Sequence, residues 1–151
     1  MRPWIFIALL VVLVLALAVR PKAETITYYV QLVRGCDGDM PPEPNSRKVG
    51  PRIIEKVRGP LRWEGYWEID RQEVLLVPGR ATNVRLGKKF MVGIDLTDQH
   101  HRKVTASQNG RVLAKVCMPR EGAMTVIGGD RDGQSSWFVV VRRDRPVLAS
   151  N

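Results

Sequence analysis

Residues 90–116 read FMVGIDLTDQHHRKVTASQNGRVLAKV, and this stretch carries the clearest signal of the fold. Every second residue of its first part is apolar, namely Phe90, Val92, Ile94 and Leu96. Alternation with a period of two is typical of a β-strand with one buried face. An Asn109-Gly110 pair then separates two further strand-like segments, 104–107 and 112–116, which predicts an antiparallel hairpin.

The register of this hairpin follows from its apolar residues. A two-residue turn would pair Val104 with Lys115 and set apolar against charged side chains. A three-residue loop, residues 108–110, pairs Val104 with Ala114 instead, so that the apolar residues of both strands share a face. We therefore predict the three-residue loop, with Gly110 in the left-handed conformation within a bulge.

Strand-like segments recur on both sides of this hairpin, with turn residues between them. The segments are 25–33, 62–70, 73–77, 82–86, 124–127 and 137–142. About seven to nine short strands at such spacing predict an all-β fold, a small antiparallel β-sandwich or partial barrel. We assign residues 24–146 to this single β-rich domain and residues 147–151 to a tail.

Two segments depart from the strand pattern. Residues 37–52 contain four prolines, which predicts an extended Pro-rich loop. Residues 53–59 place Ile53 and Val57 at helical spacing and end at Gly59, which predicts one short helix. We expect this helix to pack across an open end of the sheets.

The N-terminal residues 1–23 form a hydrophobic leader. Residues 4–19 are an unbroken apolar run of sixteen residues behind Arg2, which spans about 24 Å as a helix. A positive start, a short apolar run and an A-x-A-like site ending at Ala18 are typical of a cleaved signal peptide. The alternative is an uncleaved anchor formed by residues 4–19. The domain is then periplasmic or secreted if cleavage follows Ala18, and membrane-anchored otherwise.

The chain is strongly basic, with a formal net charge of +9. Such a charge attracts polyanions and anionic membrane surfaces in a salt-dependent way. The basic residues are spread over many predicted turns, which is typical of a generally basic surface rather than of a nucleic-acid groove. Because the leader predicts export, we expect no intracellular nucleic acid among the partners.

Cys36 and Cys117 are the only cysteines. An even count in an exported protein predicts a disulfide, which would close a loop of about 80 residues and contribute about 4–5 kcal/mol. The alternative is two separate thiols that act as small apolar side chains. The sequence has no CxxC motif and its two histidines are adjacent, so we predict neither a metal site nor a cofactor.

Aromatic residues cluster in the segment RWEGYWEI, where Trp63, Tyr66 and Trp67 lie close together. With Arg62 and Arg71 nearby, exposed rings would form a stacking and cation–π surface for a peptide, a glycan or a nucleic acid. These five residues are the predicted binding site. The alternative interpretation is that the rings fill the core.

The segment DLTDQHH, residues 95–101, is the one place where carboxylates and histidines come together. A hydrolase could use His100 or His101 to carry a proton. The alternative is a polar turn between two strands in which an aspartate caps the turn. No recognised catalytic motif is present, so we assign no catalytic residue and predict that the protein is not an enzyme.

The sequence thus leaves three functional hypotheses in order. The first is a non-catalytic exported envelope module that binds or scaffolds another envelope component, with an envelope protein as its partner. Its contacts would be the aromatic cluster and an exposed strand edge. The second is a basic domain that binds a polyanion, the cell wall or a membrane surface, and the third is a hydrolase using His100 or His101.

Overall fold

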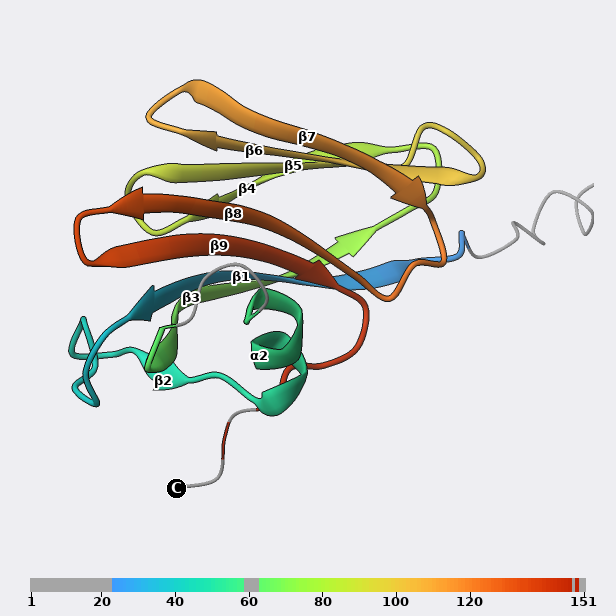
Figure 1. Cartoon of the computed structure of the whole chain (residues 1–151). Helices are drawn as coiled ribbons and strands as arrows, with labels where there is room; N and C mark the ends of the chain where they lie inside the picture. The colour runs from blue at the N-terminus through green and yellow to red at the C-terminus, as the bar shows by residue number, and fades with distance from the viewer. Residues whose placement is uncertain (1–22, 59–62, 148, 150–151) are drawn as a thin grey trace, which may run out of the picture.

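The computed structural model describes residues 23–58, 63–147 and 149, with the backbone alone for residues 129–132 (Figure 1). Residues 1–22 of the predicted leader and Arg62 lie outside the described residues. None of the helices in the described part of the chain is both long and apolar enough to cross a membrane.

Within the described residues, nine strands form two antiparallel sheets that face each other, which confirms the predicted β-sandwich. The five-stranded sheet has the order β2-β3-β1-β9-β8, and the four-stranded sheet has the order β4-β5-β6-β7. The strands are β1 (Ile26–Cys36), β2 (Arg47–Lys48), β3 (Gly65–Leu76), β4 (Ala81–Leu86), β5 (Phe90–Asp95), β6 (His101–Gln108), β7 (Arg111–Pro119), β8 (Met124–Asp132) and β9 (Ser135–Arg142).

The main core lies between the two sheets and is built by the alternation seen in the sequence. β1 contributes Ile26, Tyr28, Val30 and Leu32 to this core, and β5 contributes Phe90, Val92 and Ile94. Val139 and Val141 join them from β9, which lies between β1 and β8 in the five-stranded sheet. The period of two therefore places one apolar side of each strand against the other sheet.

β3 is a single strand where the sequence predicted two, 62–70 and 73–77. Its pairing with β1 shifts between Leu32 and Val33, so that Ile69 is an extra residue on the β3 side. The polar residues that follow interrupt the apolar pattern without interrupting the backbone pairing. The apparent break at residues 71–72 therefore comes from polar side chains within a continuous strand, and the bulge at Ile69 lies just before it.

The Asn109-Gly110 turn differs from the predicted three-residue loop. Gln108 pairs with Arg111, and both turn residues have positive φ, 50° and 81°, as a two-residue type I′ turn requires. The left-handed Gly110 is confirmed, whereas the loop length and the pairing of Val104 with Ala114 are wrong. The bulge lies instead at Leu113, inside β7, and shifts the register so that apolar residues still share a face.

Helix α2 (Pro51–Val57) covers the outer face of the five-stranded sheet and not an open end of the sandwich, so the predicted placement is wrong (Figure 1). Ile53 and Val57 pack there in a second buried cluster with Val33 and Val140. β1 and β9 carry apolar residues on both faces in this region, and the helix keeps the outer ones from water. The helix begins at Pro51, where a missing N–H costs nothing.

Cys36 and Cys117 are both free thiols, so the predicted disulfide is wrong. Cys36 is the last residue of β1, and Cys117 lies near the end of β7. Figure 1 shows that these two strands end at opposite ends of the sandwich. A disulfide needs Cα atoms within about 7 Å, which this topology does not allow. Burial raises the pKa of the Cys36 thiol.

Candidate functional site

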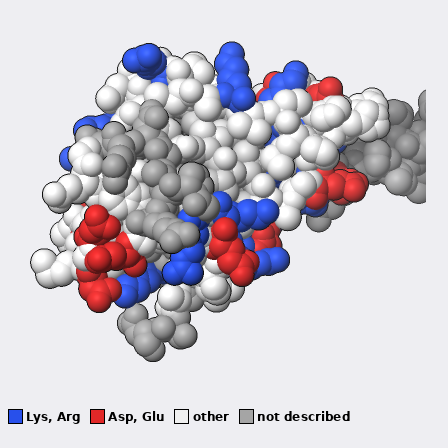
Figure 2. Space-filling model, in the orientation of Figure 1, with Lys and Arg blue, Asp and Glu red and all other residues white. Residues whose placement is uncertain are grey.

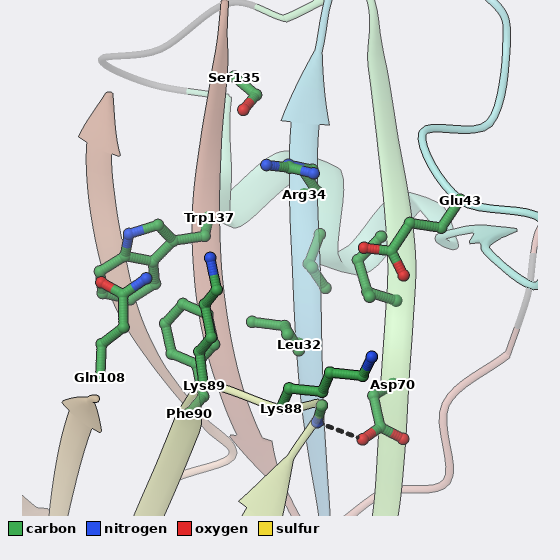
Figure 3. A pocket seen from close by; sticks show the side chains of 13 residues that line it. Leu32, Arg34, Glu43, Asp70, Lys88, Lys89, Phe90, Gln108, Ser135 and Trp137 are labelled. Carbon is green, nitrogen blue, oxygen red and sulfur yellow. Dashed lines mark hydrogen bonds between the residues drawn. The ribbon is translucent and has the colours of Figure 1, made fainter. Parts of the chain in front are cut away.

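A cleft of about 560 Å³ opens between the two sheets, at the end of the sandwich where β1 ends and β9 begins (Figure 3). We call it the β1–β5 cleft, because β1, β3 and β9 line one side and the β4–β5 turn with the start of β5 lines the other. Every one of these segments comes from a different part of the chain. The sandwich topology alone brings them together.

One wall of the β1–β5 cleft is aromatic. Phe90 of β5 and Trp137 of β9 pack with ring centroids 5.0 Å apart and planes tilted by 55°. Leu32 lies beside them on β1 (Figure 3). Because the two rings come from different sheets, they hold the cleft walls together and also offer an apolar surface to a ligand.

The cleft also carries three cationic side chains. Arg34 of β1 is partly buried at its upper end, and Lys88 and Lys89 are exposed on the β4–β5 turn (Figure 3). Among the described residues, no acceptor hydrogen-bonds or forms an ion pair with any of these three side chains. Their charges are therefore available to a ligand.

Two carboxylates, those of Glu43 and Asp70, line the cleft, and Asp70 stabilises the fold through its hydrogen bonds. Asp70 of β3 accepts a hydrogen bond from the Gly87 N–H at 2.6 Å and one from the Arg71 N–H at 2.7 Å. The first bond fixes the β4–β5 turn above β3 and so positions Lys88. Glu43, in the Pro-rich loop, is exposed and also lines the cleft (Figure 3).

The predicted aromatic site is buried. The exposed fractions of Trp63, Tyr66 and Trp67 are 7%, 5% and 6%. Trp63 and Tyr66 belong to the cluster beneath α2, and the Lys48 ammonium covers the Trp67 ring at 5.4 Å. The rings fill the interior, as the alternative interpretation held, and they form no open stacking surface.

Arg71, the remaining described member of the predicted site, binds within the protein. Its guanidinium donates from Nε and Nη2 to Glu68 Oε2, at 3.0 and 2.8 Å. Gln31 donates to the same oxygen from β1. This cluster lies on the paired strands β1 and β3, and it gives Arg71 a partner within the protein.

The segment 95–101 forms a capped turn. Asp98 Oδ1 accepts hydrogen bonds from the N–H groups of His100 and His101, both at 2.8 Å, and lies 3.2 Å from His101 Nδ1. This is the aspartate-capped turn that the sequence allowed as an alternative to a hydrolase centre. In the part of the chain that the structure describes, no group of three or more His, Cys, Asp or Glu side chains is placed to hold a metal ion.

The Asp98 cap leads to a pH prediction. Backbone hydrogen bonds from His100 and His101 lower the pKa of Asp98 to about 2. A carboxyl with a lowered pKa stabilises the fold above its unfolded value of about 4, and this contribution is lost as pH falls toward 2. In an NMR titration, the His100 and His101 amide shifts should follow a midpoint near pH 2. A midpoint near pH 4 would show that the cap does not form in solution.

Charge is not gathered into one broad surface patch on the face seen in Figure 2. Basic and acidic side chains lie next to one another over its lower part, and single basic side chains project along its upper edge. Arg52 and Arg142 both contact Asp144, with Arg52 Nη1 2.9 Å from Asp144 Oδ2. The hydrogen bond from Arg142 lowers the pKa of Asp144.

Little in the sequence indicates that the cleft residues form a binding site. Lys88 and Lys89 stand out only as a basic turn, and Arg34 only as the residue after an alternating strand. Comparison with known proteins adds no assignment, since neither a family model, nor a curated protein, nor a solved structure matches the chain.

Proposed function

We propose that the chain is a non-catalytic binding module of a cell envelope, exported by its hydrophobic N-terminus. In this proposal the domain binds another envelope component. The β1–β5 cleft binds an anionic group of that component. The observation that carries the proposal is the set of three cations in the cleft, Arg34, Lys88 and Lys89, without an acceptor among the described residues. A carboxylate or phosphate group is their natural partner.

The aromatic wall supports the same proposal. Phe90 and Trp137 lie beside the cations, so a ligand can place an apolar or planar part against the rings and its charge near Arg34. Binding sites of this size are commonly apolar surfaces with a few well-placed polar groups. The cleft also favours a defined ligand over a broad polyanion, because on the face seen in Figure 2 the basic residues are interspersed with acidic ones.

The test is capture of the partner by a variant of the cleft. The tagged full-length protein with Arg34→Gln, Lys88→Gln and Lys89→Gln is crosslinked in cells and recovered from the envelope fraction. Loss of three charge-assisted contacts should reduce the captured partner at least tenfold, because each such contact contributes about 1.5–3 kcal/mol when well formed. Far-UV circular dichroism confirms that the variant is folded.

A matched control removes the same charge from another surface. Lys103, Arg111 and Lys115 are exposed on β6 and β7, and their replacement by glutamine also removes one arginine and two lysines. The control should capture the partner as the wild type does. Equal loss in both variants would show that only net charge matters, and equal retention would show that the cleft is not used.

A further inference from the structure

A second groove, of about 540 Å³, runs along one side of the sandwich, between β3 of one sheet and β4 of the other. We call it the β3–β4 groove. β4 is the outermost strand of its sheet, and β2 pairs with β3 only at Trp67 and Glu68. Among the described residues, the outer backbone edges of β4 and of β3 beyond Glu68 therefore have no strand partner. Unpaired strand edges are the surfaces on which an extended peptide can be added to a sheet.

The sandwich is open along this groove. Gln72 and Val74 lie on the inward face of β3, because they pair across the sheet with Val30 and Tyr28, which are both fully buried. Gln72 is nevertheless exposed and Val74 is only partly buried. Val74 and Val84 both line the groove and give it an apolar floor. An added strand would thus find backbone groups to pair with and an apolar surface for its inward side chains.

The β3–β4 groove leads into the β1–β5 cleft. Asp70 and Gly87 line both hollows, and the hydrogen bond from the Gly87 N–H to Asp70 marks the place where they meet (Figure 3). Residues 70–74 of β3 span about 14 Å, so about five residues of an extended chain fill the groove. A ligand of this shape reaches the cleft with one of its ends.

The direction of the strands decides which end of a peptide reaches the cleft. β3 runs away from the cleft after Asp70, and β4 runs toward it. A peptide that pairs antiparallel with β3 therefore has its C-terminus at the cleft, where its carboxylate meets Arg34, Lys88 and Lys89. A peptide antiparallel to β4 would instead bring its N-terminal ammonium group to these three cations. The charge of the cleft therefore favours pairing with β3.

We propose that the partner of the β1–β5 cleft is a protein that binds through an extended C-terminal segment of about five residues. The segment pairs antiparallel with the free edge of β3, and its terminal carboxylate lies among the three cations. Its last side chain packs against Phe90 and Trp137, and the side chain two positions earlier faces Val74 and is apolar as well. This inference rests on the proposed function, and it identifies the anionic group as a C-terminal carboxylate.

Two matched libraries of random hexapeptides test the proposal, one with free C-terminal carboxylates and one with C-terminal amides. Each is selected against the full-length protein in non-ionic detergent. Selection should enrich free acids with apolar residues at the last position and two positions earlier. Amidation of an enriched peptide should weaken its binding about tenfold or more in fluorescence anisotropy, because it removes the charge that the cations bind. Equal enrichment from both libraries, or enrichment from neither, would overturn the proposal.

A variant of the groove separates it from the cleft. Gln72→Trp fills the β3–β4 groove and leaves the three cations in place, whereas Gln99→Trp makes the same change on the exposed loop after β5. Gln72→Trp should weaken binding of the enriched hexapeptide about tenfold, and Gln99→Trp should bind it as the wild type does. In the wild type, the bound hexapeptide should slow deuterium exchange at residues 70–74 and not on the edge strand β7. Slower exchange on β7 with none at residues 70–74 would overturn the proposal.

Partner capture distinguishes a failure of this inference from a failure of the proposed function. If the variant of Arg34, Lys88 and Lys89 captures the partner as the wild type does, the proposed function fails and this inference fails with it. If capture requires the three cations and is lost when the last five residues of the captured protein are deleted, both are supported. If capture requires the cations but survives that deletion, or delivers a glycan or a lipid, the proposed function stands and the C-terminal segment is overturned.

Discussion

Replacement of Gly128 by alanine is expected to destabilise the domain by about 2–4 kcal/mol, because it adds backbone strain and a steric clash at one position. Gly128 has φ of 143°, a conformation that L-residues rarely adopt. A Cβ there would lie 2.3 Å from the Trp137 carbonyl oxygen and 2.9 Å from Phe138 Cα. Both atoms belong to the backbone of β9, which pairs with β1 and β8 and cannot yield without loss of those bonds.

Gly133 provides the matched control for this change. It also has a positive φ, 64°, but a Cβ there would meet no atom within 4 Å. Gly133→Ala should therefore lower the free energy of unfolding by about 1 kcal/mol, through backbone strain alone. Urea unfolding of both variants separates the two contributions. Equal destabilisation would mean that the close approach of β8 to β9 at Gly128 does not exist in solution.

The Gly128 contact also bears on the cleft. Trp137 forms the aromatic wall with Phe90, and its carbonyl oxygen is the atom that an alanine at position 128 would displace. The near-UV circular dichroism of Gly128→Ala should therefore change even under conditions in which the variant is folded. The bulge in β8 thus links the sheet edge to the geometry of the candidate site.

The sequence predicts the strands well because a period of two reflects a local rule. Side chains alternate between faces, so the apolar residues of β5 mark its buried side before any partner strand is known. The turn at Asn109-Gly110 is equally local. The error in its length arose because a bulge can lie inside a strand, and the extra residue at Leu113 leaves no mark in the composition of the turn.

The buried position of Arg102 follows from the alternation of side chains along β6, although the sequence there looks like a basic turn. The alternation of Val104 and Ala106 extends back to Arg102, which places it on the core side of β6. The adjacent Lys103 made the pair look like one more basic turn. Strand phase is the better guide here, because neighbouring residues in a strand face opposite sides of the sheet.

The β1–β5 cleft, in contrast, depends on relations that a single sequence does not contain. Arg34 and Lys88 are far apart in the chain, and only the packing of one sheet on the other brings them together. The same is true of the cysteines, whose separation depends on which strands run in which direction. Composition suggested a disulfide, and the topology excludes it.

Arg71→Met is expected to cost about 1–3 kcal/mol of stability, because it leaves the Glu68 carboxylate buried without its cation. The side chain of Glu68 is 6% exposed and that of Arg71 is 24% exposed, so solvent screening moderates the effect relative to a fully buried pair. The effect should be structural. Partner capture through the cleft should persist in this variant wherever it remains folded.

A double-mutant cycle with Glu68→Gln isolates the interaction between the two side chains. Neutralising Glu68 in the Arg71→Met background removes the uncompensated charge, and Gln31 still reaches position 68 from β1. The double variant should therefore recover at least 1 kcal/mol relative to the sum of the single changes. Additive effects within about 0.5 kcal/mol would show that Arg71 and Glu68 do not interact in solution. Arg71 would then be free for a ligand, as the sequence suggested, and the recognition surface would have to extend from the cleft across β3.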